Sequence, residues 1–482
     1  MLATVFLVVP GGIAARLFLH TDILATLLEG GVRVVVLAPE SAHEGLKRDV
    51  DREDVIFEPL RPWTRYQEPF RLSTARDLVR WLRRNALDGR SSVGWGMKYS
   101  KAEGRLRKHW SRRVRFLLDA TARHLLWRSR KLRHLVLSLD LRLSDYREHA
   151  DIFDRWQPEL VVAPSLGYLM GDEGVLQEAT KRGVLTAGVI HSWDNPTSQG
   201  YKAVDPSLVV AWSQRMRQEI LRFHDVDRRR LVVGGVPHWD HYCRDGGLPG
   251  RDELFEELGL ATARRLLVFA TFVPFSYRFP NQELAETLAE AVESGEVGDD
   301  VQLLIRLHPK FMLEGADEAR RAIQDVASRH EHVHVNLPET SVQGLDYPSP
   351  RDARVLGGVI AHSDVFVNGF STTTLEACIV DRPVVLARPT AHLQGVTPQS
   401  TQDAMAHVTE FEHLRPVVAS GAARIADDRA ALIRHVRAYL RDPMLDRDAR
   451  ANLAREVCGP TDGYAGVRVG NFLLARIVQQ AR

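Results

Sequence analysis

Short apolar runs and amphipathic stretches alternate along most of the chain, and the opening shows this pattern clearly. Residues 3–9 form a continuous apolar run, a Gly11–Gly12 turn follows, residues 13–31 have helical spacing, and residues 32–39 are apolar again. Strands that are apolar at every position are typical of parallel sheets covered on both faces. The opening therefore predicts a strand–helix–strand unit. Its glycine pair lacks the GxGxxG pattern of a dinucleotide-binding turn.

The alternation resumes near residue 155 and continues through most of the remaining chain. Further predicted strands lie at 158–165, 184–192, 207–213, 230–237, 264–272, 301–309, 331–337, 364–371 and 382–387. Turn-rich residues 244–253 divide them into two groups, which predicts two Rossmann-like α/β domains that face each other across a cleft. We assign residues 1–243 to the first domain, 254–445 to the second, and 446–482 to C-terminal helices that pack back on the first domain.

The composition narrows the possible classes of protein. The chain has 482 residues, of which 44% are hydrophobic and 26% charged, and its net charge of +2 does not indicate a nucleic-acid partner. Cys243, Cys378 and Cys458 form no CxxC pair, so we expect neither disulfides nor structural zinc, and we expect a cytoplasmic location. The first residues lack the basic region of a signal peptide, and no apolar run reaches about 18 residues. Any membrane role would be peripheral, on the inner face of the membrane.

Residues 61–150 depart from the alternation and predict a helical insertion in the first domain. Within it, residues 98–147 carry many basic side chains, only four acidic ones, and Leu, Trp and Phe at helical spacing. The basic residues are Lys98, Lys101, Arg105, Arg107, Lys108, Arg112, Arg113, Arg115, Arg123, Arg128, Arg130, Lys131, Arg133, Arg142 and Arg147. Such a stretch either lies on anionic lipid or a polyanionic acceptor, or forms a solvated helix pair packed on the sheet.

Three predicted strand ends carry chemically active side chains. In open α/β sheets, ligands bind beyond the carboxyl ends of the strands. Arg306 and His308 lie at the end of the strand at 301–309, where a guanidinium and an imidazole suit a phosphate or diphosphate. The alternative is a structural role for His308 at the strand end.

The second strand end runs directly into a predicted helix. Its candidate residues are Ser371, Thr372, Thr373 and Glu376. Hydroxyl groups and the free N–H groups of a helix start form an anion site, and Gly369 lets a phosphate approach the backbone. A plain Ser or Thr helix cap is the alternative. Because Arg306 and His308 belong to the same predicted domain, we favour a donor-binding role for both strand ends.

The third strand end is the polar loop 191–198 of the first domain. Either His191 or Asp194 can take a proton from an acceptor hydroxyl. The alternative is a structural turn in which the residues around Asp194 bond to their own backbone. The candidate residues that line the acceptor site or the cleft are Gly11, Gly12, Trp193, Asn195, Thr197 and Ser198.

These motifs resemble the bacterial CDP-glycerol glycerophosphotransferase-like and surface-glycan glycosyltransferase group, which has a GT-B fold. Four elements occur here in the order typical of the group: the SWDN-like loop, a VxGxPxxD element at Val233–Asp240, the RxHP strand end and an S-S/T-x-x-x-E/D helix start. The resemblance spans about 191–388. It implies a CDP- or UDP-linked donor on the second domain, and the implied donor residues are Arg306, His308, Ser371, Thr372, Thr373 and Glu376.

One departure from the resemblance leaves the transferred group open. Glycerophosphotransferases usually carry a WHGxxxK-like loop where this chain has His191–Asn195, so both glycosyl and glycerol-phosphate transfer remain, as does the identity of the base. A weaker similarity to bacterial sialyltransferases rests on three short elements, at Asp172–Gly174, His308–Pro309 and Ser371–Thr372.

The sequence as a whole favours a metal-independent transferase with no cofactor other than its nucleotide-activated donor. Two DxD patterns, Asp49–Asp51 and Asp225–Asp227, lie in charged stretches typical of surfaces, so we expect no metal site. The expected acceptor is a hydroxyl of a surface glycan or a lipid-linked molecule. Two rival functions are a non-hydrolysing nucleotide-sugar 2-epimerase and a catalytically inactive scaffold of a glycan assembly complex.

Overall fold

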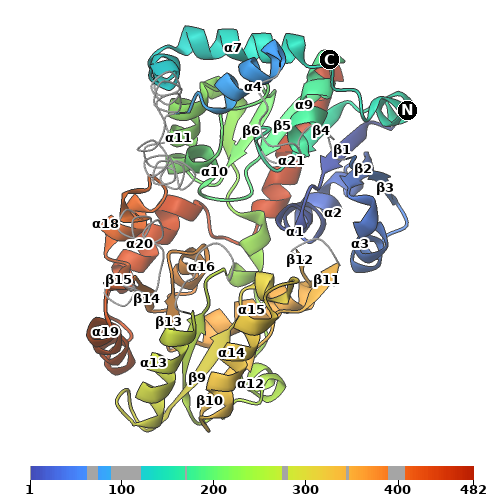
Figure 1. Ribbon diagram of the computed structural model, residues 1–482. Helices are drawn as coiled ribbons and strands as arrows, with labels where there is room; N and C mark the ends of the chain where they lie inside the picture. The colour runs from blue at the N-terminus through green and yellow to red at the C-terminus, as the bar shows by residue number, and fades with distance from the viewer. Residues whose placement is uncertain are drawn as a thin grey trace. The chain divides into compact units, whose positions relative to one another are not determined.

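The chain forms two compact units of similar architecture (Figure 1). The computed structural model describes residues 2–61, 74–87, 121–168, 171–273, 281–342, 347–388 and 408–481. Unit 1 contains the described residues up to His238 and those from Tyr464 onward. Unit 2 contains most of Trp239–Gly463.

Unit 1 is built on a seven-stranded, wholly parallel sheet in the order β3-β2-β1-β4-β5-β6-β7. The strands are β1 (Thr4–Val8), β2 (Arg33–Ala38), β3 (Val55–Pro59), β4 (Leu160–Ala163), β5 (Leu185–Val189), β6 (Leu208–Ala211) and β7 (Leu231–Val233). All five residues of β1 are buried, as the continuous apolar run predicts. The order reverses between β1 and β4, so the insertion between β3 and β4 returns the chain to the middle of the sheet.

Helices connect the strands of unit 1. They are α1 (Gly12–Leu19), α2 (Asp22–Glu29), α3 (His43–Val50), α4 (Ala75–Arg84), α7 (Arg130–Leu143), α8 (Ala150–Trp156), α9 (Asp172–Lys181), α10 (Asn195–Ser198), α11 (Gln214–His224) and α21 (Ala465–Ala481). The single helix expected at 13–31 is wrong, because Thr21 ends one helix and begins the next. Its hydroxyl donates to the carbonyl of Leu17 at 2.7 Å and accepts from the N–H of Ile23 at 3.3 Å.

The described part of the 61–150 insertion contains α4 and α7, which pack against each other. Buried ion pairs fix them to unit 1: Arg83 on α4 lies 2.6 Å from Asp140 on α7, and Arg133 on α7 lies 2.6 Å from Asp225. One face of the α4–α7 pair is therefore packed against the rest of unit 1, as expected from the alternative of a packed helix pair. Eight of the predicted basic residues lie outside the described residues: Lys98, Lys101, Arg105, Arg107, Lys108, Arg112, Arg113 and Arg115.

Unit 2 repeats the plan with a six-stranded parallel sheet in the order β10-β9-β8-β13-β14-β15. The strands are β8 (Arg265–Ala270), β9 (Val301–Arg306), β10 (Val333–Asn336), β13 (Val365–Asn368), β14 (Val384–Ala387) and β15 (Ala423–Ala426). The helices are α12 (Arg251–Leu258), α13 (Asn281–Glu293), α14 (Asp317–Ser328), α15 (Pro350–His362), α16 (Thr373–Ile379), α18 (Arg415–Ser420), α19 (Arg429–Arg441) and α20 (Arg447–Cys458). Between β10 and α15 lie the short strands β11 (Thr340–Val342) and β12 (Tyr347–Pro348), which pair with each other.

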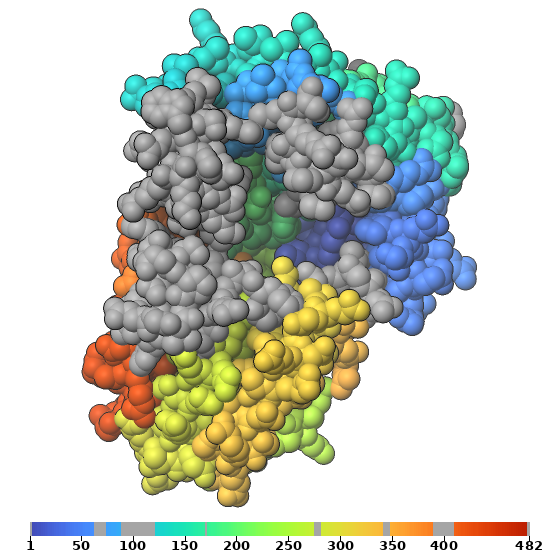
Figure 2. All heavy atoms as spheres, viewed as in Figure 1, coloured from blue at the N-terminus to red at the C-terminus, as the bar shows by residue number. Residues whose placement is uncertain are grey.

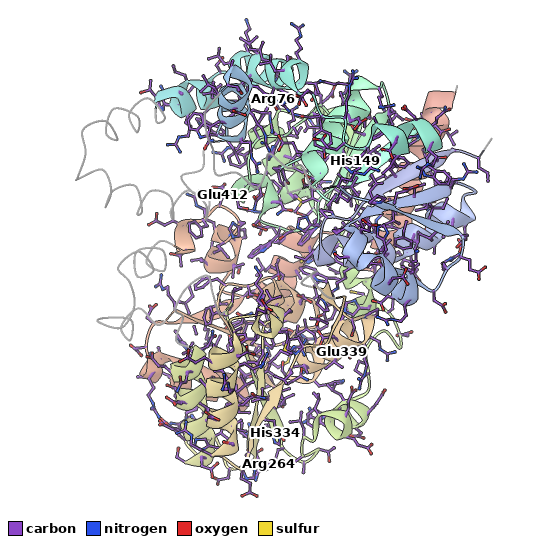
Figure 3. All side chains as sticks on the ribbon, turned by 45° about the vertical axis from the view of Figure 1, so that its right-hand side comes forward. Arg76, His149, Arg264, His334, Glu339 and Glu412 are labelled. Atoms are coloured by element: carbon purple, nitrogen blue, oxygen red, sulfur yellow. The ribbon has the colours of Figure 1, made fainter. Side chains whose placement is uncertain are left out.

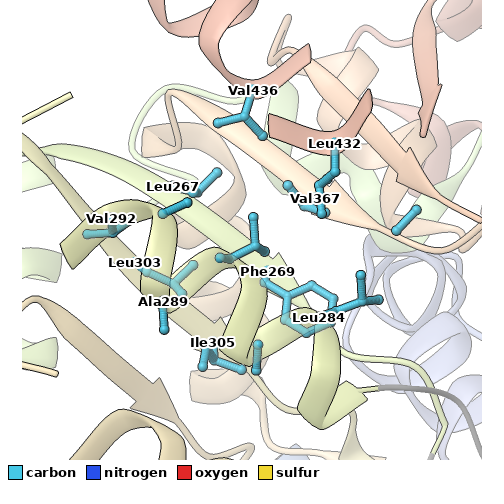
Figure 4. Packing of buried hydrophobic residues seen from close by; sticks show 14 of the residues in the cluster. Leu267, Phe269, Leu284, Ala289, Val292, Leu303, Ile305, Val367, Leu432 and Val436 are labelled. Carbon is cyan, nitrogen blue, oxygen red and sulfur yellow. The ribbon is translucent and has the colours of Figure 1, made fainter. Parts of the chain in front are cut away.

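A dry apolar core lies between the unit 2 sheet and the helices that cover it. Leu267 and Phe269 of β8 belong to one buried cluster with Leu284 and Ala289 of α13 (Figure 4). Leu432 of α19 is part of the same cluster. Burial of each such side chain contributes roughly 1.5–3 kcal/mol to folding, so the core holds the strand ends in place.

The two C-terminal helices pack on different units, although the sequence analysis groups them together. α20 packs on α16 and α18 in unit 2, whereas α21 packs on α2 in unit 1. Two glycines make the second contact close: a Cβ on Gly470 would lie 2.6 Å from the Cβ of Thr26, and one on Gly466 would lie 2.9 Å from the backbone of Asp22. The boundary between the units falls at His238 and Trp239, a little before the turn-rich stretch.

Candidate functional site

The strand order of each sheet marks where a ligand is expected to bind. Parallel strands leave a crevice at the carboxyl edge where the order reverses. In unit 1 this point lies between β1 and β4, and in unit 2 between β8 and β13. The segments that follow these strands and their neighbours contain all the site residues predicted from the sequence.

Gly11 and Gly12 follow β1 and open α1, at the reversal point of unit 1. Gly11 is in extended backbone, and its carbonyl accepts from the N–H of Ala15 at 3.1 Å. A Cβ placed on Gly11 would meet no atom of the described residues within 4 Å. Gly11 therefore leaves space beside its backbone for a ligand, but neither glycine supplies a side chain that could act as an acid, a base or a nucleophile.

His191 follows β5 and is fixed in one tautomer by its neighbour strand. Its Nδ1 lies 2.9 Å from the carbonyl oxygen of Pro164, the residue that follows β4. A carbonyl only accepts hydrogen bonds, so Nδ1 carries the proton. Burial lowers the pKa of His191, with Pro164 and Asp194 opposing the shift in part. The ring is therefore neutral near pH 7, and no described residue hydrogen-bonds to Nε2, whose lone pair can take a proton.

Asp194 uses its carboxylate to hold the loop together. Its two oxygens accept from the hydroxyls of Ser192 at 2.5 Å and Ser198 at 2.6 Å, and its backbone carbonyl accepts from the N–H groups of Thr197 and Ser198. Residues 195–198 form the short helix α10, which the sequence analysis expected as a loop. The carboxylate of Asp194 is thus engaged within its own loop, whereas Nε2 of His191 has no hydrogen-bond partner among the described residues. The roles of both residues as bases stay predictions.

The other predicted residues of this loop are largely interior. Trp193, Asn195 and Thr197 are buried, and the hydroxyl of Ser198 is used by Asp194. They shape the loop from inside and do not line its outer surface. The acceptor-lining role predicted for them stays a prediction.

Arg306, the predicted diphosphate ligand at the end of β9, lies in a buried ion pair. Its Nη2 is 2.6 Å from Oδ2 of Asp352 on α15, its Nη1 donates to Asn336 on β10, and the Arg306 side chain is 4% exposed. Asp352 also accepts from the N–H of Glu339 at 2.9 Å. In this structure the guanidinium of Arg306 therefore joins β9, β10 and α15.

His308 follows β9 and is fixed in the tautomer opposite to that of His191. Its Nδ1 accepts from the N–H of Lys310 at 3.1 Å, so the ring proton lies on Nε2. Burial, with the positive charges of Lys310 and Arg306, lowers the pKa of His308 to about 4. No described residue hydrogen-bonds to Nε2. His308 therefore presents one neutral N–H donor at the carboxyl edge of the sheet.

The segment after β13 is held by hydrogen bonds among its own polar side chains. Asn368 donates to the hydroxyl of Thr373 at 2.8 Å, and the hydroxyls of Ser371 and Thr373 are 3.0 Å apart. Phe370 between them has a positive φ of 48°, a conformation that costs free energy in a residue other than glycine. Thr372 is the N-cap of α16, but its side chain makes no capping hydrogen bond.

Two residues that the sequence analysis missed connect the predicted motifs of unit 2. Thr271, directly after β8, accepts from the N–H of His308 at 2.9 Å. The ring of Phe272 fills the space beside Gly369, where an added Cβ would overlap it at 1.6 Å. The end of β8 thus joins the His308 segment to the segment after β13. The signal was present in the sequence, because Thr271 lies at the end of the predicted strand 264–272.

Glu376 is buried on α16 and accepts from the hydroxyl of Tyr242 at 2.6 Å. Tyr242 belongs to the 3-10 segment η4 (Pro237–Cys243), which begins within the VxGxPxxD element and extends beyond it. No local pattern marks this pair, because 134 residues separate its members. The predicted donor role of Glu376 stays a prediction.

The carboxylates of the sialyltransferase-like element and of the DxD pattern at Asp225 bind other side chains of unit 1. Asp172 and Glu173 open α9, where Asp172 accepts from Ser165 and Glu173 accepts from Arg80 at 3.0 Å. Asp225 is buried with Arg133, which corrects its assignment to a surface stretch, while Asp51 ends α3. Among the described residues, no three His, Cys, Asp or Glu side chains are grouped as metal ligands.

No protein-family model and no curated protein matches the sequence. Solved structures do match the fold. The UDP-GlcNAc 2-epimerase of Neisseria meningitidis bound to UDP-GlcNAc has a TM-score of 0.53 and 10% identity, over 98% of this chain and 99% of that one. MnaA of S. aureus with UDP has a TM-score of 0.50 and 10% identity, over 98% and 96%. The wall teichoic acid polymerase TagF has a TM-score of 0.39 and 13% identity, over 57% and 60%.

The two parallel sheets and the two matches with TM-scores of 0.50 and 0.53 define the class: the chain has a GT-B fold, with two Rossmann-like units. The predicted fold class is confirmed. At these low identities the likeness extends to the fold, and the site residues of this chain must carry any argument about its activity.

Proposed function

We propose that this chain is a metal-independent GT-B transferase. It moves a glycosyl or glycerol-phosphate group from a nucleotide-activated donor to a hydroxyl of a surface-glycan or lipid-linked acceptor. The acceptor binds at the carboxyl edge of the unit 1 sheet, and the donor binds at the carboxyl edge of the unit 2 sheet. The reaction takes place in the cytoplasm, and no nucleic acid takes part.

The tautomer of His191 is the observation that carries the proposal. A hydroxyl is a weak nucleophile, and a neutral base within hydrogen-bond reach activates it. Nδ1–H of His191 is bound to Pro164, so Nε2 is the basic atom, and the lowered pKa keeps that atom unprotonated near pH 7. A general base that takes the proton of an acceptor hydroxyl must be in this unprotonated state.

The donor side of the proposal rests on His308 and the hydroxyl cluster after β13. The acceptor oxygen forms a bond to the activated carbon or phosphorus of the donor while the bond to the leaving nucleotide phosphate breaks. The acceptor proton passes to Nε2 of His191. Nε2–H of His308 donates to the leaving phosphate, with Ser371 and Thr373 as further donors. Arg306 holds this region rigid through Asp352 and adds positive charge beside His308.

A UDP-linked donor is the class that the comparisons support, and the CDP-linked alternative rests on the resemblance of the sequence motifs. The Neisseria meningitidis structure is described as bound to UDP-GlcNAc, and the S. aureus structure as a complex with UDP. Both have the fold of this chain over nearly its whole length. A nucleotide diphosphate in unit 2 therefore agrees with the placement of His308.

The epimerase alternative asks for different chemistry. Epimerisation at a sugar carbon removes and returns a carbon-bound proton, which calls for bases on the sugar with no acceptor present. The strand-end carboxylates Asp172 and Glu173 are committed to Ser165 and to arginines, so they are poor candidates for such bases. Conversion of a UDP-sugar to its epimer without an acceptor would favour this alternative.

The first experiment is a thermal-shift screen of the full chain with CDP, UDP, GDP, ADP and CMP, with and without Mg²⁺. A ligand that binds only the folded state adds about 2.7 kcal/mol at 100 times its dissociation constant. We expect stabilisation by CDP or UDP that needs no Mg²⁺ and that His308→Ala abolishes. The absence of any shift would instead favour the scaffold function.

A further inference from the structure

The outer face of α7 carries a row of exposed leucines. Leu132, Leu135 and Leu143 are 39%, 53% and 43% exposed. With the half-buried Leu139 they are spaced three or four residues apart, which places them on one side of the helix. The adjacent side of α7 packs against unit 1 through Val136, Leu137 and the ion-paired residues described above. We call Leu132, Leu135 and Leu143 the leucine face.

Other exposed apolar residues lie on the same helical layer. Leu78 of α4 is 45% exposed, and Leu125, in the helical residues 121–128 that precede α7, is 55% exposed. Thus five of the thirteen large hydrophobic residues exposed in the described part of the chain belong to α4 and the residues from 121 to 143. Figure 2 shows this layer at the surface of unit 1. A gathering of this kind usually marks an interaction surface.

Positive charge borders the leucine face. Lys131 and Arg142 directly flank it in sequence, and Arg128 lies one turn before it; all three are exposed, and none has an ion-pair partner among the described residues. Residues 121–147 hold seven basic side chains and two acidic ones. Both acidic groups are already paired, Asp140 with Arg83 and Asp145 with Arg76 of α4, which Figure 3 labels.

We propose that the leucine face binds the surface of an anionic lipid bilayer. The leucines enter the boundary between headgroups and acyl chains, and Lys131 and Arg142 contact lipid phosphates, as in amphipathic helices that lie in the membrane plane. Charge decides against a second copy of this chain, because two such faces would place like charges together. Among the described residues no helix is long and apolar enough to cross a membrane, so the contact is with the surface.

The test is sedimentation of the full chain with vesicles of phosphatidylcholine alone and with added phosphatidylglycerol. Binding needs no donor or acceptor, so its failure and the failure of the transferase proposal are separate results. We expect binding to the anionic vesicles at least about tenfold tighter than to neutral ones, and weaker in high salt. Leu132→Ser combined with Leu135→Ser should weaken it at least about tenfold.

Three controls make the result decisive. Met444→Ser removes another exposed apolar side chain, at 55% exposure in unit 2, and should leave vesicle binding unchanged. Arg142→Glu should weaken binding to anionic vesicles but not to neutral ones. The leucine variants should keep the wild-type melting temperature and nucleotide-induced thermal shift.

Several results would overturn the proposal. These are no sedimentation with anionic vesicles, equal binding to neutral ones, or binding that survives both leucine substitutions. A dimer in solution that the leucine substitutions dissolve would identify a second copy of the chain as the occupant of the face.

Discussion

The Nδ1 atom of His191 lies 2.9 Å from the carbonyl oxygen of Pro164, and this contact selects the basic nitrogen of the ring. The two residues follow β5 and β4, which are neighbours in the sheet. The register of two strands thus fixes the tautomer of the proposed base. The proposed catalysis depends on this tautomer of His191 and on the opposite tautomer of His308 in unit 2.

Replacing His191 with alanine should lower kcat by about 10²- to 10⁴-fold, the usual contribution of a general base. The proposed base is active when neutral, and burial lowers its pKa below 6.5. Transfer should therefore be full at neutral pH and fall only as the pH drops through the lowered pKa. Steady-state rates between pH 4 and 9 measure this. His362→Ala is a matched control, because His362 also bonds to a backbone carbonyl, at 2.8 Å from Pro249, away from the predicted site residues.

Replacing His308 with alanine should abolish the stabilisation by nucleotide, since it removes the Nε2–H donor. His308→Gln keeps a side-chain N–H and should recover part of it. The pKa of about 4 means that the ring stays neutral down to that pH, so the contribution of His308 to nucleotide affinity should not change between pH 8 and 5. Calorimetric titrations at these pH values give the answer. Unchanged affinity in both variants would remove His308 from the donor site.

Replacing Arg306 with alanine should destabilise unit 2 by about 3–5 kcal/mol, because it leaves the buried carboxylate of Asp352 without its partner. The double variant Arg306→Ala with Asp352→Ala should recover part of this loss. Denaturant unfolding measures both. Arg351→Ala serves as the control: its ion pairs are exposed, and its loss should cost no more than about 1 kcal/mol. A fully stable Arg306→Ala protein that no longer binds nucleotide would return Arg306 to the donor site.

Replacing Gly470 with valine should destabilise unit 1 by about 1–3 kcal/mol, the usual cost of forcing extra atoms into a tight contact. The added Cβ alone would lie 2.6 Å from the Cβ of Thr26 on α2. Gly421→Ala is unsuitable as a control because its φ is positive, whereas Gly250→Ala meets open space among the described residues. Thermal unfolding compares the two. A wild-type melting temperature for Gly470→Val would show that α21 is not packed closely on α2.

The sequence predicts most strands of the two sheets, because most of them are local apolar runs. β3, which contains Glu58 and Pro59, and β15, which contains Arg424, lie in no predicted segment. β1, β8 and β9 lie within their predicted segments, and the GT-B fold follows from their alternation with helices. The hydrogen-bond and ion-pair partners of polar side chains, in contrast, cannot be predicted from such local patterns. Nothing near Arg306 in sequence points to Asp352, and nothing near Glu376 points to Tyr242.

Local hydrogen bonds between side chains are also hard to predict from the sequence. Two serines of its own loop donate to the carboxylate of Asp194, whose role as a base stays a prediction. Thr21 looked like an ordinary helical position, because a cap inside an apolar pattern leaves the spacing almost unbroken. In each of these cases a hydrogen bond that the apolar pattern does not encode decides the outcome.

The return of α21 to unit 1 has a consequence for how the protein is made. A ribosome releases the chain from its N-terminus, so α2 emerges early, while the helix that packs on it is translated much later. The whole of unit 2 is synthesised in between and can fold as a unit of its own. During that interval the surface of α2 that α21 covers stays open to solvent or to a chaperone. Unit 1 is therefore completed only after unit 2 has been translated, and a chain truncated before Gly466 would leave unit 1 unfinished.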